Sequence, residues 1–519
     1  MAPLFLSVDC GSQSLRLLIF NSEGKLIQYE QIKYNPYFSD KPNWAEQDPE
    51  IFWKSLIKAA HQLKQKSKPD LWSKIISVCI TTQRDTVINL DKKGNILRPA
   101  IMWMDRRKAR PPWTPGFLLK AATKLIGMDE TIIKTQMDGK TNWIKQNQPD
   151  IWEKTLKVLQ VSGYLNYKLT GEFHDSNASQ IGHIPFNYKK IRWSTPGELT
   201  GKMFPIERNK LPRLFSPGEQ LGTITKKAAA ATGISEGTPV IAGASDKGCE
   251  TLGMGVINSD QAALSFGTTA TIQTTSPVYF ETLKHMPSYP AALPNYFNPE
   301  IEIFRGFWMV EWFKKQFAHS ECTKAEKLGI EPENLLNEYL VDIPAGSMGL
   351  MVLPYWTPAL KEPSSKGAIL GFGDVHTRAH VYKALIEGLN FALYEGMKKI
   401  EKRGKVNIKN IMVSGGGARS NEICQICSDI FNKKVTRGQT HETAGLGAAI
   451  ISARGMGIYD SWEQAAAEMV NYGETFTPNK ENVKLYSQLY NQVYSSIFEQ
   501  LKPLYRDIRK ITGYPEKIK

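Results

Sequence analysis

A strand–turn–strand pattern in both halves of the chain constrains its fold more than any other feature. Near the start, the apolar run Leu4–Val8 leads into a Gly-Ser turn at 9–14 and then into a second apolar run. In the second half, Ala262–Phe266 leads into a Gly-Thr-Thr turn at 267–269 and a further apolar run. Glycine lets the backbone approach a ligand closely, and successive turn N–H groups can form a concave anion site. Two such turns predict a polyphosphate held between two halves of one chain.

Length and composition indicate a multi-domain α/β protein. At roughly 150 residues per domain, the 519 residues allow two to four domains. With 41% hydrophobic and 22% charged residues, the chain is close to the globular average and can form sizeable cores. No apolar run reaches the ~18 residues of a membrane span, and the N-terminus does not have the pattern of a signal peptide. We therefore expect a cytoplasmic protein that does not contact membranes.

The formal net charge of +14 raises the question of nucleic-acid binding. The basic residues are dispersed, and Glu401 interrupts the short clusters at 398–399 and 402–403. This distribution favours a solvated surface that helps to attract phosphorylated ligands, and we expect no nucleic-acid partner. The six cysteines stand in apolar or helical contexts, which favours buried thiols over disulfides. The Cys424-x-x-Cys427 pair has no second pair or histidine at zinc spacing, so we interpret it as core packing.

Short apolar runs alternate with helical periodicity along the chain, as in α/β proteins. The pattern predicts strands at 75–80, 86–90, 239–243 and 411–413, and helices at 49–63, 151–169, 379–399, 421–431, 443–454 and 483–501. We expect the domain boundary near residues 244–255.

Further motifs stand in a set order between and after the two turns. They are Gln83-Arg84-Asp85, Trp103-Met104-Asp105-Arg106-Arg107, the segments 175–179 and 242–246, Gly371-Phe372, 376–380, Glu387-Gly388 and 415–421. Together with both turns, they resemble the FGGY family of carbohydrate kinases, which contains glycerol kinase, xylulokinase and ribulokinase. Each motif is weak alone, but so many in this order over nearly the whole chain are specific.

The resemblance implies an α/β fold of two actin-like ATPase domains of the ribonuclease-H type, with sugar and ATP meeting in the cleft between them. On this basis residues 1–245 form the N-terminal domain, with the sugar site and the first phosphate turn. Residues 246–519 form the C-terminal, ATP-binding domain, which ends in a long helix. Relatives in the family often form dimers, so a homodimer is an expectation that no segment of the chain localises.

Asp246 matches the catalytic aspartate of the family. Phosphorylation of a hydroxyl needs a base that takes its proton as the oxygen attacks the γ-phosphorus. The alternative is an aspartate that only caps a turn. Asp9 looks like a residue that positions Mg²⁺, often through water, and Asp9 with Asp246 are the candidate metal residues.

Three segments resemble the nucleotide site of the family. Phosphate contacts are expected from Gly11, Ser12, Gln13 and Arg16 in the first turn and from Gly267, Thr268 and Thr269 in the second. The loop with Gly416 and Gly417, followed by Asn421 at a helix start, resembles the adenosine site. The family often has threonine where Gln13 stands, so this position departs from the pattern. An ordinary β-turn at 267–269 is the alternative.

On the acceptor side, Arg84 and Asp85 supply a donor and an acceptor for adjacent hydroxyls. Gln83-Arg84-Asp85-Thr86 is similar to the Gln-Arg-Glu-Thr of glycerol kinases and less like the Gln-Met-His of xylulokinases. The shorter Asp85 leaves room for a substrate larger than glycerol. Trp103 covers one face of the carbon chain or is a packing aromatic. Asp175 is the substrate-side aspartate or caps the following turn.

Lys247 follows the expected base, where the family usually has glutamine or asparagine. It binds an acidic or oxidised sugar, pairs with Asp246 and lowers the pKa of that carboxyl, or points to solvent. The leading hypothesis is an ATP-dependent, Mg²⁺-requiring kinase of a small sugar or polyol. The alternatives are glycerol kinase proper and a non-kinase actin-like ATPase, since one fold hosts many functions.

Overall fold

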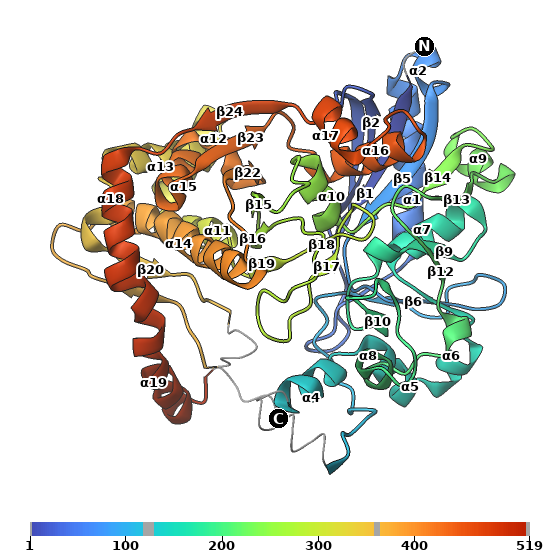
Figure 1. Cartoon of the computed structure of the whole chain (residues 1–519), viewed down its shortest axis with the longest axis horizontal. Helices are drawn as coiled ribbons and strands as arrows, with labels where there is room; N and C mark the ends of the chain where they lie inside the picture. Colours follow the sequence, from blue (N-terminus) through green and yellow to red (C-terminus); the bar gives the residue numbers. More distant parts are fainter. Residues whose placement is uncertain (1–2, 118–128, 358–363, 515–519) are drawn as a thin grey trace.

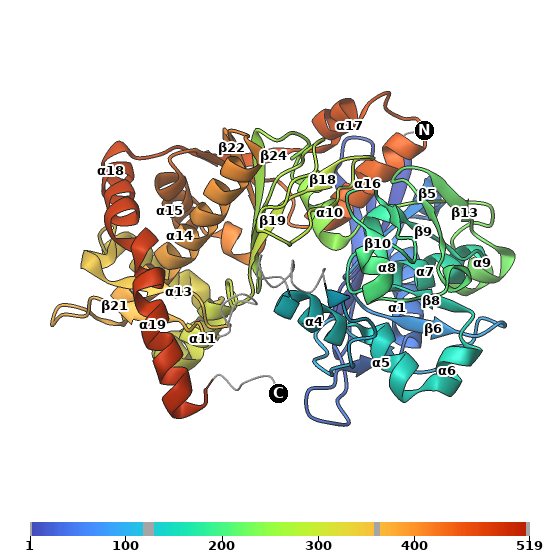
Figure 2. The ribbon, with the colours of Figure 1, turned by 60° about the horizontal axis from the view of Figure 1, so that its bottom comes forward.

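The computed structural model describes residues 3–117, 129–357 and 364–514 (Figure 1). Two six-stranded sheets, each covered by helices, form its two halves (Figure 2). Within the described residues, no helix is both long enough and apolar enough to cross a membrane. All six cysteines are free thiols, and Cys424 and Cys427 are buried, which confirms the interpretation of that pair as core residues.

The first sheet has the order β13-β14-β5-β1-β2-β3. Its strands are β1 Leu4–Cys10, β2 Ser14–Asn21, β3 Leu26–Lys33, β5 Ile75–Thr82, β13 Gln220–Thr223 and β14 Pro239–Ile241. The β1 strand pairs antiparallel with β2 and parallel with β5. Antiparallel pairs also join β2 to β3 and β13 to β14, and β14 pairs parallel with β5.

The second sheet repeats this arrangement, with the order β19-β16-β15-β22-β23-β24. Its strands are β15 Gln261–Phe266, β16 Ala270–Gln273, β19 Glu300–Ile303, β22 Asn410–Ser414, β23 Lys434–Gly438 and β24 Tyr472–Phe476. The β15 strand pairs antiparallel with β16 and parallel with β22, and the outer pairs have the same directions as in the first sheet. The strand–turn–strand pattern of the sequence is therefore an architectural repeat.

The central strand β1 is buried on both faces along its whole length, which explains its continuous apolar run. Because side chains alternate along a strand, Leu6 packs with helix α1 (Glu50–Lys66) and Phe5 packs with helix α16 (Thr443–Gly455). Helix α16 comes late in the chain but packs on β1, β5 and helix α10 (Asp246–Gly253). The domain boundary at 245/246 stays a prediction. Wherever that boundary lies, helix α16 comes between strands β23 and β24 of the second sheet in the chain and packs on the first sheet.

Most of the predicted helices are present. They are α1, α14 (Arg378–Gly404), α15 (Asn421–Phe431) and α16. The single helix predicted at 151–169 is wrong, because α6 (Pro149–Lys154), β8 (Lys157–Leu159) and α7 (Val161–Thr170) occupy that segment. The β8 strand pairs antiparallel with β6 (Ile88–Leu90), so strand pairing overrides the helical periodicity there. The helix predicted at 483–501 is longer: α18 (Lys480–Leu489), a π-helical turn (Tyr490–Tyr494) and α19 (Ser495–Thr512).

The remaining elements complete the two halves. In the first half they are β4 Glu46–Gln47, α2 Pro69–Trp72, β7 Ala100–Ile101, α4 Asp129–Met137, α5 Lys140–Asn147, β9 His174–Ser176, β10 Phe186–Asn187, β11 Arg192–Trp193, α8 Leu199–Met203, β12 Arg213–Phe215 and α9 Lys226–Thr232. In the second half they are β17 Tyr289–Pro290, β18 Phe297–Asn298, α11 Trp308–Phe317, α12 His319–Leu328, α13 Pro332–Asp342, β20 Met351–Leu353, β21 Ala368–Leu370 and α17 Trp462–Met469. Short 3₁₀ turns lie at Asn177–Ser179, Arg208–Lys210, Ser347–Gly349 and Gly416–Arg419.

Candidate active site between the two sheets

Asp246 is the first residue of helix α10, directly after the loop that leaves β14. The Ser245 side chain caps this helix by accepting a hydrogen bond from the N–H of Gly248. The Asp246 side chain remains 35% exposed, and its Oδ1 lies 3.7 Å from Nε of Arg84. Burial raises the pKa of Asp246, whereas the charges of Arg84 and Lys247 act to lower it. The carboxylate is thus reachable and favours a proton more than an exposed aspartate does.

Arg84 connects the two halves of the molecule. Its Nη1 donates to Oε1 of Glu300 on β19 at 2.9 Å, and its guanidinium lies 5.1 Å from the ring centre of Tyr289. Burial acts to lower the pKa of Arg84, but Glu300 and Asp246 outweigh it and raise that pKa, so the guanidinium stays charged. Three buried polar atoms here have no hydrogen-bond partner among the described residues: Gln83 Nε2, Arg84 Nε and Glu300 Oε2. Such atoms suit a polar ligand, because a buried polar group without a partner is costly.

Asp85 adopts a left-handed backbone conformation with φ of 52°. Its Oδ2 accepts from Lys140 Nζ at 2.6 Å and from His183 Nδ1 at 2.8 Å, and its Oδ1 accepts from the His183 backbone N–H. Burial acts to raise the pKa of Asp85, but Lys140 and His183 hold it well below its usual range. A Cβ on Gly182 would lie 2.3 Å from Asp85 Oδ1, so only glycine fits beside this carboxylate. Asp85 therefore positions Lys140 and His183 while it remains ionised.

Lys140 and His183 were not among the residues expected from the sequence, and neither stands in a recognisable motif. Lys140 is the first residue of α5 and only 4% of its side chain is exposed. A buried lysine is rare without a partner, but the sequence does not show which carboxylate would supply one. Glu300 was missed for the same reason.

Trp103 is held at the site by a chain of hydrogen bonds. Its Nε1 donates to Ser12 Oγ at 2.8 Å, and Ser12 Oγ donates to Gln83 Oε1 at 2.8 Å. Trp103 remains 46% exposed, which is unusual for so large an aromatic side chain. The structure thus brings the first turn, the 83–85 segment and an exposed indole together. The Ser12 hydroxyl, expected at a phosphate, donates its hydrogen to Gln83 here.

Asp9 lies at the end of β1 with 12% of its side chain exposed. Arg16 Nη1 lies 3.4 Å from Asp9 Oδ2 and 3.0 Å from Oε2 of Glu442, which precedes α16. Burial raises the pKa of Asp9 to about 7, with Arg16 opposing and Asp246 adding to the rise. The described residues contain no group of three or more acidic, histidine or cysteine side chains that could hold a metal. A single buried carboxylate fits Mg²⁺, which keeps waters and phosphate oxygens as its other ligands.

Lys247 is hydrogen-bonded, directly or through Glu250, to the ends of the strands that precede the turns at 267–269 and 415–417. Its Nζ donates to Glu250 Oε2 at 2.7 Å and to Ser265 Oγ at 3.2 Å, and Ser414 Oγ donates to Glu250 Oε1 at 2.6 Å. Ser265 and Ser414 are paired on β15 and β22, directly before the turns at 267–269 and 415–417. Of the three readings of Lys247, the one in which it points to solvent is wrong, because Glu250 and Ser265 hold its ammonium group.

The turns at 267–269 and 415–417 have glycines and exposed backbone, which a ligand needs to approach the main chain closely. Gly415 has φ of +88°, and a Cβ there would lie 2.8 Å from the backbone of Phe266. Gly416 is exposed, with no atom within 4 Å of a Cβ at that position. In the second turn, Gly267 and Thr268 accept hydrogen bonds from the backbone N–H groups of 307 and 308, and Thr268 is exposed. Backbone at both turns is therefore accessible to a ligand.

Three of the other expected residues lie in two different settings. Gln13 and Asn421 are exposed, and Oδ1 of Asn421 accepts from Arg437 at 2.9 Å. Asp175 is 0% exposed and accepts from Ser162, Asn166, Gln180 and the backbone N–H of Ser176. Burial raises the pKa of Asp175 to about 6. Its contact with substrate stays a prediction, and these four donors favour a structural role on β9.

Comparison with known proteins agrees with the two-part architecture. Residues 4–253 match the N-terminal domain of the FGGY family of carbohydrate kinases, and residues 262–456 match the C-terminal domain of that family. The chain is 27% identical over 511 residues to the uncharacterized sugar kinase YgcE of Escherichia coli, covering 98% of this chain and 93% of that protein. It is 25% identical to the xylulose kinase of Bacillus subtilis, covering 93% and 94%. The solved xylulose kinase from Rhodospirillum rubrum superposes with a TM-score of 0.82 at 23% identity, covering 97% and 100%.

Proposed function

The chain belongs to the FGGY family of carbohydrate kinases, and on this premise we propose that Asp246 is the base for phosphoryl transfer from Mg-ATP to a hydroxyl of a neutral small sugar or polyol. The protein is a carbohydrate kinase, and kinases of this family take their phosphoryl group from ATP. The observation that carries the proposal is a reachable Asp246 carboxylate beside Arg84, at a point where residues of both halves meet.

Asp246 would act by holding the acceptor hydroxyl and taking its proton as the oxygen attacks the γ-phosphorus. The burial that raises the pKa of Asp246 makes the carboxylate a stronger base. The charge of Arg84 opposes this rise in pKa and favours the ionised carboxylate, which is the form that can accept a proton. The backbone N–H of Lys247 donates to Asp246 Oδ1 at 2.8 Å and keeps the carboxylate in one orientation.

Gln83 Nε2, Arg84 Nε and Glu300 Oε2 form no hydrogen bond with any residue that the structure describes, and they would supply two donors and one acceptor for adjacent hydroxyls of the acceptor. The exposed face of Trp103 suits the carbon chain of a sugar.

The charge balance of the site favours a neutral acceptor over a sugar acid. Arg84 is offset by Asp246 and Glu300, and Lys247 is offset by Glu250. No lysine or arginine of this group is left without a carboxylate to attract an acidic sugar. The relatives include proteins named xylulose kinase and proteins named gluconokinase, so the preference for a neutral acceptor rests on the charge balance alone.

The donor nucleotide is assigned to the turns on the two sheets. Backbone N–H groups of 11–13 and 267–269 would bind its phosphates, with Arg16 adding charge. The adenosine is assigned to Gly416, Gly417 and Asn421. Bound Mg²⁺ supplies positive charge that offsets the phosphate oxygens, and Asp9 with Asp246 would hold it. Asp9 fits this part because its carboxylate is largely buried near the end of β1, close enough to Asp246 for the two charges to interact.

The test is a coupled ADP-release assay with Mg-ATP over polyols, ketopentoses, ketohexoses and sugar acids. A neutral sugar or polyol is expected to raise ATP turnover strongly. A response to sugar acids alone would overturn the neutral acceptor. ATP turnover that is fast and independent of every sugar would instead support a non-kinase ATPase.

A further inference from the structure

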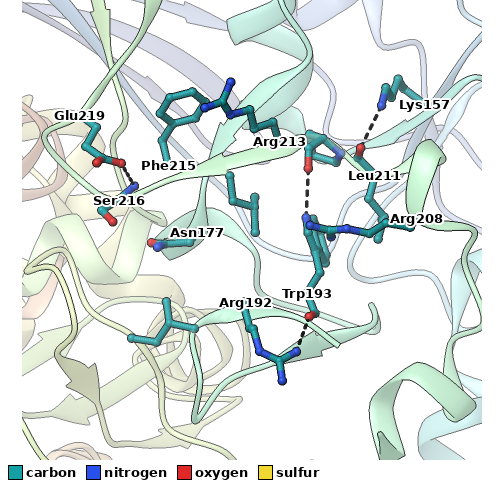
Figure 3. Close-up of a pocket in the computed structure, with 13 residues that line it drawn as sticks. Lys157, Asn177, Arg192, Trp193, Arg208, Leu211, Arg213, Phe215, Ser216 and Glu219 are labelled. Atoms are coloured by element: carbon teal, nitrogen blue, oxygen red, sulfur yellow. Dashed lines mark hydrogen bonds between the residues drawn. The ribbon is translucent and has the colours of Figure 1, made fainter. Parts of the chain in front are cut away.

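A cavity of 490 Å³ lies in the first half, and none of the residues that line it belongs to the candidate active site (Figure 3). Strand β11, the 3₁₀ turn Arg208–Lys210 and strand β12 with the loop after it form much of its wall. Trp193 is buried in this wall, and its Nε1 donates to the carbonyl oxygen of Pro212 at 3.0 Å. The volume lies within the range of about 300–1,000 Å³ that small-molecule sites occupy.

The charged side chains of the wall are strongly biased toward one sign. Four are basic, Lys157, Arg192, Arg208 and Arg213, and one is acidic, Glu219. Arg192 is neutralised by two hydrogen bonds to Glu198 at 2.9 and 3.0 Å. The other three basic groups have no carboxylate within ion-pair distance in the described part of the chain.

Arg208 interacts electrostatically with two other basic groups of the wall, Arg192 and Lys157. Its guanidinium lies 5.9 Å from the ring centre of Trp193, and Arg213 lies 5.0 Å from that of Phe215 (Figure 3). Burial and the charge of Arg192 lower the pKa of Arg208, and burial and the charge of Arg208 lower the pKa of Lys157. These cations therefore repel one another, and a bound anion would relieve that repulsion.

The backbone of the cavity wall is bonded to the segment that carries Asp246. The N–H of Ser245 donates to the carbonyl of Ala178 at 3.1 Å, next to the wall residue Asn177. The N–H of Ala242 donates to the carbonyl of the wall residue Glu219 at 2.8 Å. A shift of the backbone in the cavity wall would therefore displace the backbone at 242–246.

We propose that this cavity is a second binding site, for a small organic phosphate that regulates the enzyme through the 242–246 segment. Guanidinium groups suit phosphate because they donate paired hydrogen bonds to its oxygens. The apolar side chains of Ile191, Leu214 and Phe215 in the same wall suit an organic group attached to the phosphate. Binding of the phosphate does not depend on the acceptor or on the role of Asp246, whereas the regulatory effect rests on the proposed function.

The test is calorimetric titration with phenyl phosphate at low ionic strength, with the cleft occupied by Mg²⁺ and a non-hydrolysable ATP analogue. Arg208→Gln is expected to weaken binding about tenfold or more, as loss of a charged hydrogen bond implies. The matched control is Arg110→Gln, an exposed arginine outside the cavity wall, which should bind as wild type does. Because Arg208 is exposed, its variant should fold, and equal melting temperatures would verify this.

The binding site is overturned if Arg208→Gln binds phenyl phosphate as tightly as wild type, or if wild type binds none up to about 10 mM. It is also overturned if a single-stranded oligonucleotide binds in an Arg208-dependent way while phenyl phosphate does not. Saturating phenyl phosphate should change the turnover of wild type with its sugar at least twofold and leave Arg208→Gln unchanged. An equal effect on both proteins, or none on wild type, would overturn the regulatory role.

Discussion

Arg84 Nε lies 3.7 Å from Asp246 Oδ1, although the two residues come from different segments of the chain. The same guanidinium donates to Glu300 on the second sheet. One cation, Arg84 of the first half, is therefore shared by the proposed base Asp246 and by Glu300 on the second sheet. Since Arg84 lowers the pKa of Asp246 and joins the two halves, changes at these residues should separate proton transfer from acceptor binding.

Asp246→Asn should reduce kcat by about 10²-fold or more, because the amide cannot accept the hydroxyl proton. The affinity for ATP should remain close to that of wild type. Steady-state kinetics with the responding sugar and calorimetric titration with an ATP analogue would measure both quantities. Turnover close to wild type would remove Asp246 from the role of base.

Arg84→Gln should raise KM for the sugar about tenfold, as loss of a charged hydrogen bond implies. It should also move the acidic limb of the kcat/KM profile to higher pH, because the charge of Arg84 lowers the pKa of Asp246. Arg84→Lys keeps the charge and should move the limb less. The exposed Arg110→Gln serves as control. An unchanged limb in Arg84→Gln would contradict the electrostatic coupling.

The sequence predicted the parts of this structure that depend on local pattern. The turns at 9–14 and 267–269 follow apolar runs, and both runs form strands as expected. The helix at 151–169 was wrong because Lys157–Leu159 pairs with Ile88–Leu90, a long-range contact that periodicity does not report.

The sequence predicted only part of the candidate site, because long-range contacts also decide which side chains meet there. Asp246 and Arg84 stand in motifs, whereas Lys140, His183 and Glu300 stand in none. Their importance arises only when folding brings Lys140 and His183 to Asp85, and Glu300 to Arg84. A lone lysine or histidine gives no local signal of such a partner.

Asp9→Asn should stabilise the metal-free protein at pH 8 more than at pH 5. The pKa of Asp9 is about 7 in the folded protein and 3.8 ordinarily, so folding favours the protonated form between these values. Stability from this group is therefore present at low pH and is lost as pH rises through about 7. Melting temperatures of both proteins at the two pH values, without Mg²⁺, would measure the difference.

The same variant should lose most of its Mg²⁺-dependent turnover if Asp9 positions the metal. A variant that is more stable at pH 8 but less active fits a buried carboxylate kept for function. Equal stabilisation at both pH values would contradict the raised pKa, and full activity would contradict the metal role.

Gly447→Ala should destabilise the protein by about 1–3 kcal/mol, as overpacking typically does. Helices α10 and α16 pack closely here, and a Cβ on Gly447 would lie 2.0 Å from the carbonyl oxygen of Cys249. Because backbone rather than a flexible side chain blocks the new methyl group, the two helices must move apart. Gly197→Ala is the control, because no atom lies within 4 Å of a Cβ there. Denaturant unfolding would measure both variants, and equal stability would mean that the α10–α16 contact is not tight. Since α10 begins at Asp246, Gly447→Ala should also lower turnover, whereas Gly197→Ala should not.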